Sequence, residues 1–271
     1  MTTSPLDLMV EDLREHIPQL EIRYKDSSKF MKLLGFLLTP VNPTFMTKFV
    51  TTVGTRVYFP NRKHIVDLPT DSMAVLAHEF VHMWDEEKEG SLKYVHSYLS
   101  PQLYFALTIL AYCSLVSWIP GVVFIGGYLA SCWAAKSNRI AGYGALAATV
   151  VLAIASAWLF AGWWAPLALL AAFAPLAPWP SKGRTRLELR GYSMSVAVHR
   201  WLIGKDASKS YLDAMQVYFT GPAYYFMSRS PSKIAEALED ALRATQTGDI
   251  LQEEPYCVVY DSLKKHGRLV D

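Results

Sequence analysis

The stretch DSMAVLAHEFVHMWDEE, Asp71–Glu87, determines how the rest of the chain is interpreted. It contains no Gly or Pro and follows a start signal at Pro69, which predicts one continuous helix. His78 and His82 are four positions apart, so their imidazoles project from the same side of that helix. This spacing allows them to share a zinc ion, with Glu79 beside the open coordination position as a general base. The alternative is a chance match, with two half-buried histidines on an ordinary amphipathic helix.

The composition excludes some classes of function. The chain has 271 residues, which is enough for one large domain or two small ones. Its net charge of +2 gives no support to polyanion binding, so no nucleic-acid partner is expected. Its three cysteines are far apart without metal-ligand spacing, and no disulfide framework is implied. The polar, acidic N-terminal sequence predicts that no signal peptide is cleaved.

Between Gln102 and Pro180 the sequence is almost wholly apolar. Short breaks divide it into four runs, Leu103–Ile119, Val122–Ala135, Ile140–Phe160 and Trp163–Trp179. As helices these runs would be about 25, 21, 31 and 25 Å long, against a hydrocarbon core of about 30 Å. The third is long enough to span, the first and fourth are marginal, and the second is short. A buried soluble core would need polar faces, and none is visible. The block predicts about four membrane-embedded segments in two hairpins, so the lipid bilayer is an expected partner.

The charges around this block predict its orientation. Two hairpins return the chain to its starting side, so residues before 100 and after 180 would share one side of the membrane. The basic residues that would flank this side are Lys93, Lys136, Arg139, Lys182, Arg184 and Arg186, while the opposite turns carry no charge. By the positive-inside rule, the predicted zinc helix then faces the cytoplasm.

The segments before the zinc helix are shorter. Residues 5–25 predict an amphipathic helix that stops near Pro18. Lys29–Leu38 predicts a core helix, with a helix in the membrane interface as the alternative. A small antiparallel sheet is expected from three runs rich in β-branched and aromatic residues, Phe49–Val53, Thr55–Phe59 and His64–Leu68. An edge strand of this sheet is suited to hold an extended peptide by backbone pairing. The equally weighted alternative is that these strands do no more than cover the predicted zinc helix.

A catalytic zinc needs a third protein ligand. No third histidine follows at short spacing, because Asp85 and Glu89 occupy that region, so the ligand should come from another helix. Glu188 is the best candidate, since it is the first acid after the apolar block, near the start of a predicted helix Arg184–Gly204. Tyr192 lies one turn later on the same face, as a candidate catalytic residue that would either donate to the transition state or support a ligand.

Other assignments for these residues stay open. Glu188 is equally placed for a surface ion pair with Arg184. Asp85 is suited either to orient a ligand imidazole or to be solvated at the helix end. Weaker candidates for the third ligand are Asp213, Glu236 and Glu239. His199 is too far along its helix to share a metal with Glu188.

These motifs resemble membrane-integrated zinc endopeptidases of the HtpX and CAAX-prenyl-protease type. That family has an HExxH helix, then membrane-spanning helices, then a Glu ligand in a second motif. His78, Glu79 and His82 match the first motif, and Glu188 followed by Gly191-Tyr192 looks like a version of the second, from about 70 to 200. The resemblance implies a gluzincin-like site with zinc on the two histidines and Glu188. Two departures are the lack of apolar spans before the zinc helix and Tyr192 in place of Asp.

The expected fold is mainly α with a small antiparallel β-sheet, a zincin-like catalytic domain interrupted by a transmembrane insertion. Residues 1–100 and 181–271 would form its halves and residues 101–180 the insertion. The expected function is that of a membrane-anchored zinc endopeptidase acting on peptide or membrane-protein substrates. The alternatives are a non-catalytic membrane protein with a structural or vestigial HExxH motif and a zinc hydrolase with a non-peptide substrate.

Overall fold

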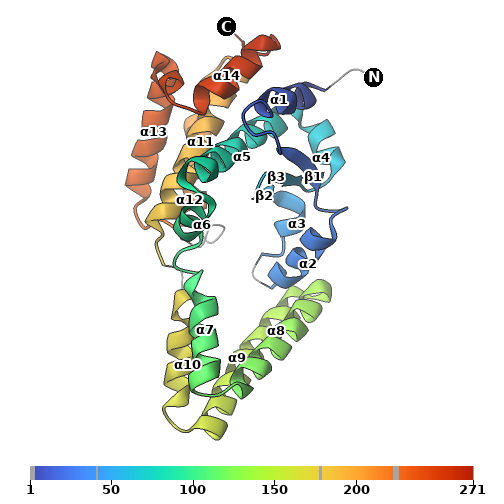
Figure 1. Cartoon of the computed structure of the whole chain (residues 1–271), viewed down its shortest axis with the longest axis vertical. Helices are drawn as coiled ribbons and strands as arrows, with labels where there is room; N and C mark the ends of the chain where they lie inside the picture. Colours follow the sequence, from blue (N-terminus) through green and yellow to red (C-terminus); the bar gives the residue numbers. More distant parts are fainter. Residues whose placement is uncertain (1–3, 41, 177–178, 222–225, 271) are drawn as a thin grey trace. The chain divides into compact units, whose positions relative to one another are not determined.

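The computed structural model describes residues 4–40, 42–176, 179–221 and 226–270, and it is mainly helical (Figure 1). In chain order the helices before the apolar block are α1 (Pro5–Leu13), α2 (Lys29–Leu38), α3 (Phe45–Lys48), α4 (Arg62–Asp67), α5 (Pro69–Glu89) and α6 (Ser91–Leu99). Those of the apolar block are α7 (Tyr104–Leu115), α8 (Ile119–Ser137), α9 (Arg139–Ala161) and α10 (Ala165–Phe173), followed by the 3-10 turn η1 (Ala174–Leu176). The rest are α11 (Lys182–Ile203), α12 (Lys209–Thr220), α13 (Pro231–Thr247), η3 (Asp249–Gln252) and α14 (Tyr256–Lys265).

The chain divides into two compact units. Unit 1 consists of Met1–Lys25, Val50–Tyr98 and Pro180–Asp271, and unit 2 of Asp26–Phe49 and Leu99–Trp179. Residues 26–49, which precede the predicted zinc helix in sequence, therefore group with the apolar helices rather than with that helix. Ala177 and Pro178, near the end of the predicted fourth apolar run, lie outside the described residues.

Unit 1 contains a small sheet whose strands are β1 (Glu21–Tyr24), β2 (Thr51–Val53) and β3 (Arg56–Phe59). The prediction of an antiparallel sheet is wrong in its pairing, because β3 is central, with β1 parallel and β2 antiparallel to it. Parallel pairing requires a long crossover, which the chain makes through Asp26–Phe49 in unit 2.

Two other segments of unit 1 also differ from the prediction. His64–Leu68, predicted as a strand, begins inside α4, because the Asn61 side chain accepts a hydrogen bond from the His64 amide and starts a helix. The helix predicted within residues 5–25, with a stop near Pro18, ends at Leu13. Glu21–Tyr24 then forms a strand, and it replaces His64–Leu68 as the third strand of the sheet. Local capping and strand pairing decide these segments more strongly than their apolar content does.

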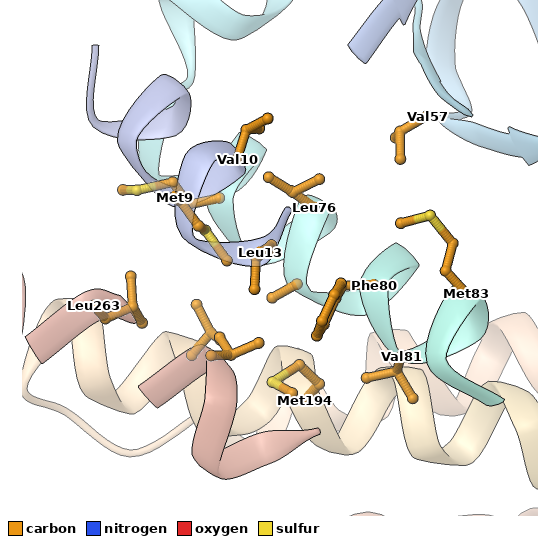
Figure 2. Packing of buried hydrophobic residues seen from close by; sticks show 14 of the residues in the cluster. Met9, Val10, Leu13, Val57, Leu76, Phe80, Val81, Met83, Met194 and Leu263 are labelled. Carbon is orange, nitrogen blue, oxygen red and sulfur yellow. The ribbon is translucent and has the colours of Figure 1, made fainter. Parts of the chain in front are cut away.

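The core of unit 1 lies between α1, α5, α11 and α14. Leu13, Leu76, Phe80, Met194 and Leu263 are buried there from four helices that are distant in sequence (Figure 2). Each such side chain contributes about 1.5–3 kcal/mol on burial. The packing places α5 along α11, and α11 ends at Gly204, whose φ of 68° suits a residue without a Cβ. The two helices that carry the predicted metal ligands are therefore held side by side by the main core.

Unit 2 is built around the antiparallel pair α8 and α9. Asn138 separates them, and its side chain caps α9 by accepting from the Ile140 and Ala141 amides. α7 and α10 pack against this pair through an interior rich in alanine, which lets helices approach closely. By length and composition α8 and α9 can cross a membrane, and only 28% and 17% of their apolar windows are buried. A core helix of a soluble protein would be mostly buried. α7 and α10 are shorter than predicted.

Candidate metal centre

Three buried side chains from two helices converge at one point in unit 1. α5 contributes His78 and His82, one turn apart, with 3.1 Å between their Nε2 atoms. α11 contributes Glu188, whose Oε2 is 3.5 Å from the His78 Nε2 and whose Oε1 is 3.8 Å from the His82 Nε2. One ligand atom from each residue lies within 4.8 Å of the others. The structure thus brings together the three predicted metal ligands.

The chemistry of this group fits a bound cation. Glu188 is 1% exposed, and within the described part of the chain its buried Oε2 has no hydrogen-bond partner. Buried carboxylates normally have such partners, and this oxygen lies 3.5 Å from the His78 Nε2, so a cation held between the two residues would satisfy it. Two imidazoles and one carboxylate form a donor set that suits zinc and leaves one coordination position open.

Contacts behind the ligands fix their orientation. The Ser195 hydroxyl lies 3.2 Å from the Nδ1 of His78, so this ring is held with its Nε2 toward the centre. The Tyr98 hydroxyl donates a 2.5 Å hydrogen bond to the Oε1 of Glu188. The other carboxylate oxygen, Oε2, faces the His78 Nε2, while Oε1 also lies near the His82 Nε2. Sequence analysis identified neither contact.

Tyr98 is itself held in place by α11. The Arg184 Nε donates a 2.7 Å hydrogen bond to the Tyr98 carbonyl, and its guanidinium lies 5.4 Å from the centre of the Tyr98 ring. Tyr94 stacks on the same ring at 5.9 Å. Arg184, considered from sequence as an ion-pair partner for Glu188, thus supports the tyrosine that contacts Glu188. Two tyrosines four apart on α6 were the available signal, but aromatic packing gives the same pattern.

Glu79, the predicted general base, follows His78 on α5 and is half-buried. The Thr52 hydroxyl on β2 donates a 2.7 Å hydrogen bond to its Oε2. Its negative charge favours the protonated form of both histidines, although burial leaves the net pKa of His82 lowered. Burial lowers the pKa of the Lys25 amine to about 8, and the charge of Glu79 opposes this shift. The Glu79 carboxylate is thus held by a hydrogen bond from the sheet, and its charge acts on the Lys25 amine.

Burial and mutual charge shift the pKa of all three residues in this group. Burial raises the pKa of Glu188, but the histidines and Tyr98 outweigh it and the net pKa is lowered. Burial lowers the pKa of His82, and its net pKa is lowered. Burial acts on His78 in the same direction, but the Glu188 carboxylate outweighs it and raises the pKa of that ring. An ionised Glu188 and a neutral His82 match what metal coordination requires, whereas the His78 ring would have to lose its proton when a metal binds.

No protein family, curated protein or solved structure matches this chain. The resemblance to membrane-integrated zinc peptidases therefore remains a prediction from the motifs.

Tyr192 and Gly191 both lie against His78. The Tyr192 ring packs edge-on at 4.8 Å from the His78 ring and also lies 5.2 Å from the Phe219 ring. A Cβ on Gly191 would lie 2.7 Å from the Cε1 and Nε2 of His78. Glycine at this position is what allows α11 to approach the histidine so closely. Its place three residues after Glu188 was a signal that sequence analysis noted only as part of a motif.

The remaining candidates lie elsewhere. Asp85 pairs with the Arg190 Nε at 3.1 and 3.0 Å, so it links α5 to α11. It does not orient His82, whose Nδ1 has no hydrogen-bond partner in the parts of the chain that are described. The His199 ring stacks on Tyr211 at 4.9 Å. Three further acids are absent from the ligand group found in the described residues, namely Asp213, Glu236 and Glu239.

Proposed function

We propose that this protein is a membrane-anchored, zinc-dependent endopeptidase. The observation that carries the proposal is the convergence of His78, His82 and Glu188 beside Glu79. A purely structural metal site has no need for a carboxylate positioned as a base next to an incomplete ligand set. A hydrolase needs both.

The chain's own residues would divide the reaction between them. The two histidines, through Nε2, and the Glu188 carboxylate would hold zinc, which when bound supplies a Lewis acid that polarises a carbonyl and acidifies water. Glu79 would accept a proton from the attacking water and deliver it to the leaving amine. Thr52 would keep the Glu79 carboxylate in one orientation through its hydrogen bond to Oε2. Tyr98 would hold Glu188 as a ligand.

Strand β2 favours a peptide as the substrate. It is at the edge of the sheet, since the order is β1-β3-β2, and its Thr52 contacts Glu79 directly. The outer edge of β2 has no strand partner within the described residues. An extended peptide that paired with this edge would lie alongside the base, in the manner of β-strand addition.

The membrane part of the proposal depends on unit 2. α8 and α9 would anchor the protein, and the charged connections would face the cytoplasm together with unit 1. Glu188 follows Trp179 closely in sequence, so the site is tethered to the apolar block by a short segment. Substrates would accordingly be membrane proteins or segments near a membrane.

The test is the zinc content and peptidase activity of the detergent-purified chain. Wild type is expected to hold one zinc, and His82→Ala and Glu188→Ala to lose it, while Glu236→Gln serves as an acid-to-amide control outside the site. Glu79→Gln should keep the zinc and lose peptide hydrolysis by at least about a hundredfold. Absence of zinc from wild type, even after reconstitution, would refute the proposal. Glu79→Gln with full biological activity would favour a non-catalytic membrane protein.

A further inference from the structure

The charges of unit 2 gather at one end of its helices. Its acidic residue is Asp26, and its basic residues, all exposed, are Lys29, Lys32, Lys48, Lys136 and Arg139. Lys136 and Arg139 flank the α8–α9 connection. The other three lie on α2 and α3, which pack against each other. This cationic end is defined here by those five basic residues.

α2 is attached to the same end of α8. The Tyr128 hydroxyl donates a 2.6 Å hydrogen bond to the Leu37 carbonyl, and the Lys136 Nζ lies 5.0 Å from the centre of the Phe36 ring. Figure 1 shows α2 beside the α8–α9 connection, in agreement with these contacts. The lysines of α2 therefore belong to one surface with those of the connection.

The outer face of α2 combines basic and apolar side chains. Met31 and Gly35 face inward and are buried, whereas Phe30 and Leu33, which follow Lys29 and Lys32 in sequence, are 54% and 58% exposed. A core helix, the first prediction for this segment, would bury these large apolar residues. Exposed aromatic and aliphatic groups beside lysines are typical of a helix that lies in a membrane interface, with its amines reaching the phosphates.

The opposite end of the unit has a different character. Trp118 precedes α8, and Trp163 and Trp164 follow α9; all are exposed, and neither connection carries a charge. Tryptophans at one end of a helical pair and basic residues at the other are expected at the two surfaces of a bilayer. α9, at 23 residues or about 34 Å, is long enough to separate two such surfaces.

We infer that the cationic end is a binding surface for anionic phospholipid headgroups, with α2 lying in the interface and Phe30 and Leu33 among the acyl chains. Charge complementarity commits the surface to this occupant, because lipid phosphates lie at the level that the five basic residues reach when α8 and α9 span. The inference rests on the proposed membrane anchoring but not on the peptidase chemistry.

The test uses the full chain, delipidated in a non-ionic detergent and titrated with dioleoylphosphatidylglycerol or dioleoylphosphatidylcholine, with bound lipid counted by native mass spectrometry. Wild type should bind the anionic lipid at least about tenfold more tightly, since each basic residue near an anionic surface contributes roughly fivefold. The variant Lys29→Gln/Lys32→Gln/Lys136→Gln/Arg139→Gln should lose this preference. A matched variant, Lys205→Gln/Lys209→Gln/Lys233→Gln/Lys264→Gln, removes the same charge from exposed positions of unit 1 and should retain it.

Each other outcome overturns the inference in a distinguishable way. Equal binding of both lipids, or an equal loss of the anionic preference in the matched variant, would show that the cationic end is not a specific surface for anionic lipid. The proposed membrane anchor would be unaffected by that result. Full displacement of the anionic lipid by inorganic phosphate would assign a general anion site instead. Recovery of the chain without detergent would refute the anchoring itself, whatever the zinc content. If the fourfold variant fails to fold, Lys29→Gln/Lys32→Gln on α2 makes the same comparison.

Discussion

Gly191 is the residue where α11 comes nearest to a predicted metal ligand. In a helix, Gly→Ala normally stabilises by about 1 kcal/mol. Here the added Cβ would lie 2.7 Å from the His78 ring, which Ser195 and Tyr192 hold from other sides. Overpacking of this kind costs about 1–3 kcal/mol, so Gly191→Ala should weaken zinc binding roughly ten- to a hundredfold while the chain still folds.

The matched control for Gly191→Ala is Gly144→Ala. Gly144 lies inside α9, where an added Cβ would meet nothing within 4 Å. Its substitution should leave zinc binding unchanged. Competition with a chelator of known affinity measures both variants. Unaltered zinc affinity in Gly191→Ala would show that the histidine tolerates displacement and that the close approach has no bearing on the site.

Tyr98 supports a second prediction at the residue scale. Tyr98→Phe keeps the ring that Arg184 and Tyr94 contact but removes the hydroxyl that donates to Glu188. Loss of a partner behind a metal ligand typically costs ten- to a hundredfold in affinity, and zinc binding should fall by about that factor. Tyr94→Phe removes a hydroxyl from the neighbouring ring and should have little effect. An equal loss in both variants would indicate packing rather than orientation of the carboxylate.

The sequence contained enough information to select the three candidate ligands but not the residues that support them. His78 and His82 are related by helical spacing, a local property, and the placement of Glu188 followed from chain order around the apolar block. Ser195, Thr52 and Tyr98 come from three different elements, and their contacts depend on how those elements pack. Serine, threonine and tyrosine are common in ordinary helices and strands, so composition gave no reason to select them.

At the scale of elements, one carboxylate ties the first helix to the last. Asp12 is the penultimate residue of α1. Its carboxylate accepts hydrogen bonds from the Ser262 hydroxyl and the Lys265 amine of α14, both at 2.7 Å, and lies 2.8 Å from the His266 Nε2. Burial raises the pKa of Asp12, but these partners outweigh it and the net pKa is lowered from its usual 3.8. The ionised Asp12 carboxylate is therefore stabilised more in the folded protein than in the unfolded chain.

This shift predicts how stability depends on pH. Because the pKa of Asp12 is lower in the folded protein, its carboxylate contributes its full stabilisation of the fold above pH 3.8. This contribution is lost as the pH falls through the pKa that Asp12 has in the folded protein. Asp12→Asn should lower the melting temperature by about 2–4 °C at pH 7, and the difference from wild type should shrink below pH 4. Thermal unfolding followed by circular dichroism checks this. Asp261→Asn, an exposed acid on α14, is the control. A difference that persists at low pH would assign the effect to packing.

Elements with strong local signals were predicted closely, and those that depend on partners were not. The range Lys29–Leu38 agrees with α2, and the predicted stop at Gly204 agrees with the end of α11. The sheet was mispaired because Glu21–Tyr24 becomes a strand only where β3 offers it an edge. Three-residue and four-residue strands contain too few side chains for alternation to identify them.

At the scale of the whole molecule, unit 1 holds both ends of the apolar insertion together. Arg184 bonds to the Tyr98 carbonyl, and the position of a Cβ on Gly183 would be 2.4 Å from the Ser97 carbonyl oxygen. The main core of unit 1 draws on α1, α5, α11 and α14 without the apolar helices. The candidate metal site likewise uses residues of unit 1 alone.

These features predict that the metal site survives removal of the insertion. A variant in which a short Gly/Ser linker replaces Leu99–Trp179 has only a small gap to bridge, because residues 98 and 184 already touch. It should bind one zinc, with affinity within about tenfold of the full chain, since Tyr98 and Glu188 are retained. Its dependence on detergent should decrease, because α8 and α9 are gone, although α2 still exposes Phe30 and Leu33.

Zinc content and unfolding of this shortened chain distinguish two ways in which the insertion can act. Cooperative unfolding together with one zinc per chain would establish that the insertion anchors a site that unit 1 builds by itself. Adding His82→Ala to the shortened chain is the control, and it should abolish the zinc. A folded chain without zinc would mean that the apolar helices restrain α6 and α11 so that Tyr98 meets Glu188. Membrane embedding would then be part of how the metal site forms, and loss of the bilayer would inactivate the protein through that contact.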